Sequence, residues 1–110
     1  MQTDTFKDKV VIVTGGANGI GLCIADEFRS LGAVVYVIDK QEGEHFVGDI
    51  SKKEVLEAFA AKVLSKHDKV DIIINNALPL MKGIDECSYE EFQYALSVGV
   101  TAPFYLVKLL

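Results

Sequence analysis

A glycine-rich stretch near the N-terminus has the residue types and spacing that can bind a phosphate. Residues 10–21 read VVIVTGGANGIG, so a run of β-branched apolar residues leads directly into closely spaced glycines. This pattern predicts a buried strand, a tight loop and then a helix, whose first N–H groups and dipole attract a phosphate. Gly15 permits the tight turn, Gly19 lets a pyrophosphate approach the backbone, and Gly21 lets the helix pack closely on the strand.

An acidic residue stands where a second strand should end. Asp39 lies 18 positions after Gly21 and directly follows the apolar run at residues 33–38. A carboxylate at that place in a dinucleotide-binding fold accepts hydrogen bonds from ribose hydroxyls. Strand, glycines, helix and acid in this order favour a dinucleotide site over the alternative, an ordinary strand–turn–helix.

The elements that would position these residues alternate between apolar runs and helical patterns. The runs are continuous rather than alternating, which indicates strands buried on both faces of a parallel sheet. We expect strands at residues 10–13, 33–38, 45–48 and 71–75, and helices at 19–31, at 51–66 and from 88 onward. These predict one α/β dinucleotide-binding domain over residues 1–110, a Rossmann-like parallel sheet of about four strands, in the order 3-2-1-4, with flanking helices.

Two further sequence patterns indicate where the helices begin and which face of the first helix is buried. Capping boxes over residues 51–54 and 88–91, both of the form Ser-x-x-Glu, predict two helix starts. Cys23 lies beside the expected core stripe of the first helix and is predicted to be a small buried thiol. The residues expected to form that stripe are Ile20, Ile24, Phe28 and Leu31.

The connection between the second and third strands is unusually short. Only five residues, 40–44, separate Asp39 from His45. A helical crossover needs ~10–12 residues, whereas five extended residues reach roughly 17 Å. We therefore expect a loop, a sheet face that is poorly covered at this edge, and a partly exposed His45.

Composition excludes several classes of partner. The chain carries a net charge of −5 and has no cluster of lysines and arginines, which argues against nucleic acid or an anionic membrane. Residues 1–5 lack the order of a signal peptide, and no apolar run approaches the length of a membrane span. Cys23 and Cys87 are too few for a disulfide framework and have no metal-site spacing. We expect a reduced, cytoplasmic protein without a metal site.

Three motifs, in the right order, resemble those of the short-chain dehydrogenase/reductase family. Thr14 to Gly21 fits its TGxxxGIG cofactor loop, and Asp49-Ile50 resembles its adenine-contacting Asp–Val pair. Residues 75–77, Asn-Asn-Ala, resemble the start of its Asn-Asn-Ala-Gly motif after the fourth strand. The resemblance covers essentially the whole chain and implies the N-terminal, cofactor-binding portion of such an oxidoreductase.

The resemblance implies a role for each matching position. The glycine loop would hold the pyrophosphate, Asp39 the adenosine ribose and Asp49 the adenine amino group, although both acids could simply point to water. The predicted cofactor-binding residues are Gly15, Gly16, Asn18, Gly19, Ile20, Gly21, Asp39, Asp49, Ile50, Asn76 and Ala77. A carboxylate at position 39 would repel a 2′-phosphate, so NAD is expected rather than NADP. Lys40, beside Asp39, argues the other way.

Three departures from the family pattern concern catalysis. Leu78 replaces the glycine of Asn-Asn-Ala-Gly, and Gly99 stands where the family has an active-site asparagine. The family's catalytic Ser and Tyr-x-x-x-Lys lie further along the chain than Leu110. Tyr36 and Lys40 have the required spacing but belong to a strand, where residues four apart are ~13 Å apart. No catalytic residue is therefore predicted within these 110 residues.

Pro103 predicts an interruption in the last helix. It has no N–H to donate to the carbonyl of Gly99, so we expect a kink at that point even though the family's asparagine is absent.

These observations lead to three hypotheses. The first is the NAD-binding portion of a short-chain dehydrogenase, either a fragment or a naturally short product, unable to turn over alone. The second is a non-catalytic oligomerising or interaction protein with a vestigial cofactor site, which Leu78 and Gly99 favour. The third is an enzyme completed by another chain. We also expect a homo-oligomer, formed through the edge of the fourth strand and the apolar C-terminal helix.

Overall fold

A four-stranded parallel sheet forms the centre of the part of the chain that the computed structural model describes, residues 5–79 and 82–110. The strands are β1 (Val10–Thr14), β2 (Val34–Asp39), β3 (Phe46–Val47) and β4 (Ile72–Asn75). Their order is β3-β2-β1-β4, and every pairing is parallel. The predicted fold class and strand order are confirmed.

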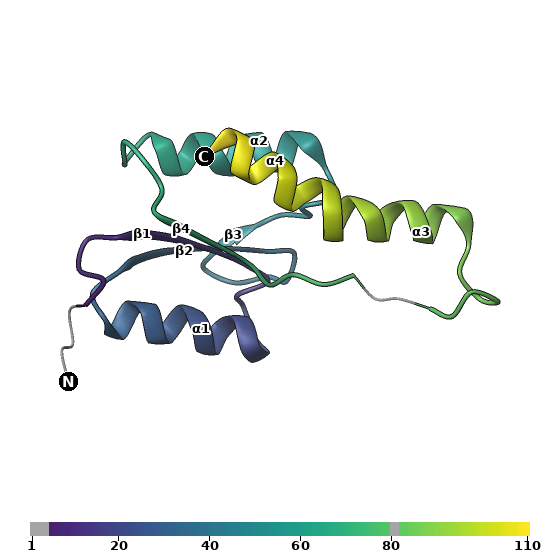
Figure 1. Ribbon diagram of the computed structural model, residues 1–110, viewed down its shortest axis with the longest axis horizontal. Coiled ribbons are helices and arrows are strands. Elements are labelled where there is room, and N and C mark those ends of the chain that lie inside the picture. Colours follow the sequence, from purple (N-terminus) through teal and green to yellow (C-terminus); the bar gives the residue numbers. More distant parts are fainter. Residues whose placement is uncertain (1–4, 80–81) are drawn as a thin grey trace.

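Helices cover both faces of the sheet. They are α1 (Gly19–Ser30), α2 (Lys53–Leu64), α3 (Tyr89–Leu96), the π-helical turn η1 (Ser97–Thr101) and α4 (Ala102–Leu109). Figure 1 shows α1 on one face, α2 and α4 on the other, and α3 projecting beyond the end of the sheet. Over the ranges 5–79 and 82–110, no helix combines the length and apolarity needed to cross a membrane.

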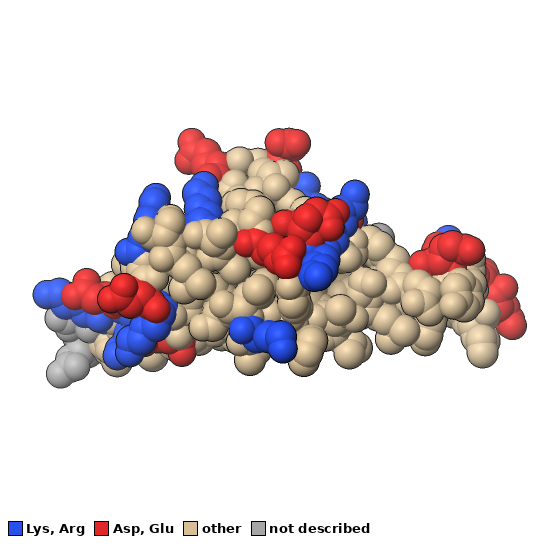
Figure 2. Space-filling view, turned by 90° about the horizontal axis from the view of Figure 1, so that it is seen from above, with Lys and Arg blue, Asp and Glu red and all other residues tan. Residues whose placement is uncertain are grey.

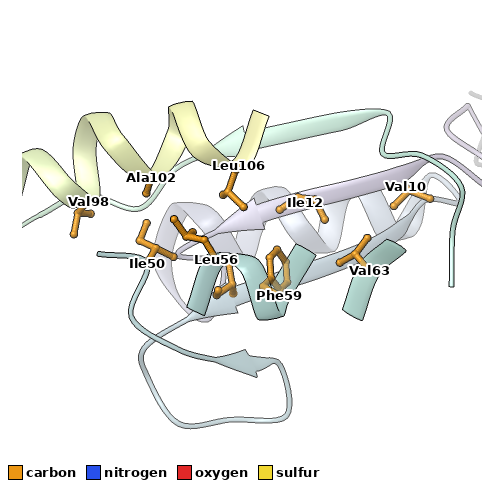
Figure 3. Close-up of a cluster of buried hydrophobic side chains, with 10 residues drawn as sticks. Val10, Ile12, Ile50, Leu56, Phe59, Val63, Val98, Ala102 and Leu106 are labelled. Carbon is orange, nitrogen blue, oxygen red and sulfur yellow. The ribbon is translucent and has the colours of Figure 1, made fainter. Parts of the chain in front are cut away.

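Strand β1 is fully buried because alternate residues supply two separate apolar clusters. Val11 and Val13 pack on the α1 face, and Ile12 packs on the opposite face. There Phe59 of α2 and Leu106 of α4 meet Ile12, as Figure 3 shows. Burial of side chains this large stabilises the fold by about 1.5–3 kcal/mol each. The cluster around Ile12 thus attaches α4 to the sheet.

The buried stripe of α1 is displaced from the predicted one. Gly21 and Ala25 face the sheet, whereas Ile20 is 75% exposed and Cys23 is also exposed. Ile24 and Phe28 do pack against the core. The buried stripe therefore begins at a glycine, and residues without bulk allow α1 to approach the sheet closely. The predictions of a buried Ile20 and a core thiol at Cys23 were wrong.

One predicted capping box is correct and the other is not. The Ser88 hydroxyl accepts the N–H of Glu91, and the Glu91 carboxylate accepts the N–H of Ser88, so α3 begins as expected. Helix α2 begins later, with Lys52 as its N-cap and no side-chain cap bond. The reason is that the Asp49 carboxylate accepts the N–H of Ser51, forming a turn before the helix.

The short connection after β2 is a loop, as expected. His45 is half-buried but lies just outside β3, and its Nε2 contacts the carbonyl oxygen of Gln41 at 2.7 Å. Val47 of β3, on the face that α1 covers elsewhere, is 39% exposed. The predicted gap in the cover of this sheet edge is confirmed.

The attachment of α4 to the core can be tested at nearby positions. Leu106 is fully buried, so Leu106→Ala should lower the free energy of unfolding by about 2–5 kcal/mol. Lys108 is exposed and is not part of the core, so Lys108→Ala should change it by less than about 0.5 kcal/mol. Urea denaturation followed by circular dichroism measures both. Equal losses would contradict an anchoring role for Leu106.

Candidate cofactor-binding site

A cleft of about 690 Å³ lies at the carboxyl ends of the strands, with α3 as its far wall. β1 and β4 are neighbours in the sheet, and the strand order reverses there, which is where parallel α/β sheets place their ligands. Most of the predicted cofactor-binding residues line this cleft, although their role stays a prediction. They are Gly15, Asn18, Ile20, Asp39, Asp49, Ile50, Asn76 and Ala77.

The remaining predicted glycines shape the loop from behind the cleft. A Cβ on Gly16 would press on the Val37 side chain, and one on Gly21 would overlap the carbonyl oxygen of Gly15. Both glycines are therefore packing residues. Gly15 and Gly19 have φ angles of +67° and +57°, which favour glycine, and a Cβ on Gly19 would meet nothing within 4 Å. The backbone at Gly19 thus faces open space just before α1.

Thr14 joins the glycine loop to the segment after β4. Its buried Oγ1 accepts the N–H groups of Asn76 and Ala77, each at 3.1 Å. Nδ2 of Asn76 donates to the carbonyl oxygen of Gly15 at 3.1 Å. The sequence analysis placed Thr14 in a motif but missed this function. The available signal was a single hydroxyl at the end of an otherwise apolar strand.

Asp39 is held at the junction of β2 and the glycine loop. Oδ2 accepts the N–H of Ala17 at 3.1 Å, and Oδ1 accepts the N–H of Gln41 at 2.9 Å. The carboxylate therefore faces the loop and does not simply extend into water. This orientation places a fixed negative charge at the rim of the cleft.

Asp49, Tyr94 and Lys40 form a cluster that the sequence analysis missed. The Tyr94 hydroxyl donates to both carboxylate oxygens of Asp49 at 3.2 Å, and Nζ of Lys40 donates to that hydroxyl at 3.2 Å. Burial alone would raise the pKa of Asp49, but hydrogen bonds from Ser51 and Tyr94 and the charge of Lys40 lower it overall. The hydrogen bond to Tyr94 is the main cause that raises the pKa of Lys40. A sequence motif relates residues only a few positions apart, so none could link Tyr94 with Lys40 and Asp49.

One face of α3 completes the wall of the cleft. Glu90, Glu91, Tyr94 and Val98 recur at helical spacing and line it. Nζ of Lys82 lies 2.7 Å from the Glu91 carboxylate. Lys82, and then the backbone N–H of Ser88, lower the pKa of Glu91 to about 2. The helix start and the cleft wall therefore depend on the same ionised carboxylate.

The departures from the family pattern can now be placed. Leu78 lines the cleft and is 85% exposed, so its side chain packs against little of the protein there. Gly99 lies in η1, where the N–H of Ala102 bonds to the carbonyl oxygen of Ser97. The predicted interruption is thus present as a π-helical turn, and the helical ribbon changes direction there (Figure 1). Because Pro103 has no N–H for the carbonyl of Gly99, the regular pattern fails at this point.

Comparison with known proteins identifies the family. Residues 9–110 match the model of the short chain dehydrogenase family. The chain belongs to this family. It is 32% identical to L-fucose dehydrogenase of Mus musculus over 118 residues, which cover 94% of this chain and 43% of that protein. The chain thus spans less than half the length of this relative.

Solved structures agree with this assignment. An apo SCOR enzyme from Clostridium thermocellum superposes with a TM-score of 0.84 at 36% identity, over 93% of this chain and 47% of that one. A metagenomic short-chain oxidoreductase in complex with NADP gives a TM-score of 0.84 at 27% identity, over 94% of this chain and 55% of that one. The family binds nicotinamide cofactors, and the described fold corresponds to the N-terminal half of its longer members.

The junction at Thr14 makes a direct prediction. Thr14→Val keeps the side-chain shape but removes the acceptor for two backbone N–H groups, which should cost about 1–3 kcal/mol or more in the free energy of unfolding. Thr14→Ser keeps the hydroxyl and is the matched control. Urea denaturation measures stability, and hydrogen exchange of the Asn76 and Ala77 amides reports the local effect. Unchanged exchange in Thr14→Val would show that the hydroxyl does not hold this segment.

Proposed function

We propose that this chain is the NAD-binding portion of a short-chain dehydrogenase-type oxidoreductase. In this proposal the glycine loop receives the pyrophosphate, Asp39 the adenosine ribose, and Asp49 with Ile50 the adenine. The observation that carries it is the carboxylate of Asp39, held by the N–H groups of Ala17 and Gln41 at the rim of the cleft. A fixed acceptor pair there suits the hydroxyls of a ribose.

The open backbone at Gly19 supports the fit of a dinucleotide. The space above it and the start of α1 suit a pyrophosphate. When bound, a nicotinamide cofactor donates or accepts a hydride. The residues of this chain bind and orient the adenosine half of the cofactor.

The reaction also requires a side chain that transfers a proton. No tyrosine within residues 1–110 has a lysine four positions later on a helix. We infer that these residues bind the cofactor without completing the reaction. The tyrosine–lysine pair described in the cleft, Tyr94 with Lys40, is bonded to Asp49, which this proposal assigns to the adenine rather than to the reacting nicotinamide. The substrate would be chosen by groups outside the described cleft.

Charge favours NAD over NADP. A 2′-phosphate would approach the carboxylate of Asp39, and like charges about 4 Å apart repel by about 1–4 kcal/mol, depending on their exposure to water. The same carboxylate accepts hydrogen bonds from the 2′- and 3′-hydroxyls of NAD without that penalty.

Asp39→Asn tests the cofactor proposal. The substitution removes the charge and leaves one acceptor oxygen instead of two. The dissociation constant for NAD should rise by about tenfold, corresponding to about 1.4 kcal/mol, and discrimination against NADP should decrease. Isothermal titration calorimetry with both dinucleotides measures this.

The exposed Asp68, outside the cleft, offers a matched control. Asp68→Asn should leave both dissociation constants unchanged. Absence of NAD binding by the unmodified chain would contradict the proposal and favour the second candidate, a non-catalytic protein that functions by association.

A line of exposed apolar side chains favours association between copies, in either case. β4 pairs only with β1 in the described sheet, so its other edge is open. In Figure 2 the surface between the central charged groups and the acidic group at the α3 end is uncharged. The exposed apolar residues along α3, η1 and α4 are Phe92, Leu96, Val100, Phe104 and Val107. We propose a homo-oligomer that buries this line and the β4 edge.

Light scattering coupled to size-exclusion chromatography tests the association. The chain should elute as a dimer or larger species at micromolar concentration, and Val100→Glu with Phe104→Glu should shift it toward the monomer. A monomeric unmodified chain would contradict this proposal.

A further inference from the structure

The side chain of Lys40 points toward Tyr94 rather than toward the carboxylate of Asp39, the residue before it. It follows Asp39 directly, yet its Nζ donates to the hydroxyl of Tyr94 at 3.2 Å and lies 5.4 Å from the centre of that ring. The same hydroxyl donates to both oxygens of Asp49. The ammonium group is therefore on the Asp49 side of the cleft.

This placement affects the choice between dinucleotides. Among the described residues that line the cleft, Lys40 is the one lysine or arginine. A mobile ammonium beside the ribose-binding acid could reach a 2′-phosphate and offset its repulsion from Asp39. Such a contact requires Lys40 to leave Tyr94 first.

We propose that Tyr94 is a positioning residue that sets the preference for NAD by holding Lys40 away from a 2′-phosphate. This inference rests on the proposed cofactor site. Three observations support it: the hydrogen bond, the ring contact and the attachment of the same hydroxyl to Asp49, which fixes the phenol in place. The hydrogen bond to Tyr94, and to a smaller extent the charges of Asp49 and Asp39, raise the pKa of Lys40.

Removal of one oxygen atom tests the inference. Tyr94→Phe keeps the ring and its packing but removes the hydroxyl that binds Lys40. The ratio of the dissociation constants for NADP and NAD should fall by roughly fivefold, the size expected for a contact between exposed groups. Calorimetry on the full 110-residue chain gives both constants. Altered contacts at Asp49 affect the two cofactors equally, since they share the adenine, and cancel from the ratio.

Lys40→Met separates this mechanism from a general change in the cleft. Alone it should leave the ratio unchanged, because Lys40 is not engaged with the 2′-position in the unmodified chain. Combined with Tyr94→Phe it should abolish the fivefold change. A rise in the ratio in Lys40→Met alone would overturn the inference, since it would mean that Lys40 already contacts the 2′-phosphate.

Tyr105 provides a matched control outside the cleft. Its hydroxyl donates to Glu57 at 2.6 Å, and Nζ of Lys53 lies 5.9 Å from its ring centre, so Tyr105, like Tyr94, combines a carboxylate acceptor with a lysine near the ring. Tyr105→Phe should leave the ratio unchanged. An unchanged ratio in Tyr94→Phe, with NAD still bound, overturns the inference alone. Absence of NAD binding in the unmodified chain overturns the proposed function and this inference with it.

Discussion

The close approach of α1 to the end of β1 is the constraint on which the rest of the structure depends. A side chain at Gly21 would overlap the carbonyl oxygen of Gly15, the same oxygen that accepts Nδ2 of Asn76. Helix, glycine loop and the segment after β4 therefore meet with no room for an extra atom. Thr14 also holds this junction together, because its hydroxyl accepts the N–H groups of Asn76 and Ala77. The floor of the cleft is consequently built from backbone rather than from mobile side chains.

The strands and their order could be predicted because continuous apolar runs and a glycine loop have few alternative arrangements. The loop after β2 could be predicted from its length alone. The buried face of α1 could not, because hydrophobic spacing favours Ile20 whereas the junction requires Gly21 against the sheet, which turns Ile20 outward. Similarly, residues 51–54 match a capping box, but the Asp49 carboxylate accepts the Ser51 N–H that the Glu54 side chain would accept in such a box. Local patterns failed where a contact with a residue outside the pattern, the Gly15 carbonyl in one case and the Asp49 carboxylate in the other, decided the structure.

The candidate site likewise has a part that the sequence predicts and a part that it does not. Residues that follow strand ends could be predicted, because parallel strands bring their carboxyl ends to one edge. The far wall could not, because Tyr94 reaches Asp49 across 45 positions of sequence and depends on the direction of α3. That direction is set by η1, where Pro103 prevents the regular hydrogen bond to Gly99. A backbone detail more than 50 residues after the β3 strand thus decides which side chain contacts Asp49 in the cleft.

The π-helical turn also explains why a cleft can exist beside a helix that projects from the body. Ala102 and Leu106 bury the following helix in the core, and Val98 is buried within the turn while it lines the cleft. Helix α3 is therefore fixed at one end by apolar packing and at the cleft by the polar contacts of Tyr94. On its outer side this helix exposes Phe92 and Leu96. The same helix thus presents polar groups to the cleft and apolar groups on its outer side. The glycine loop and this wall together enclose the cleft in which we propose that a dinucleotide binds.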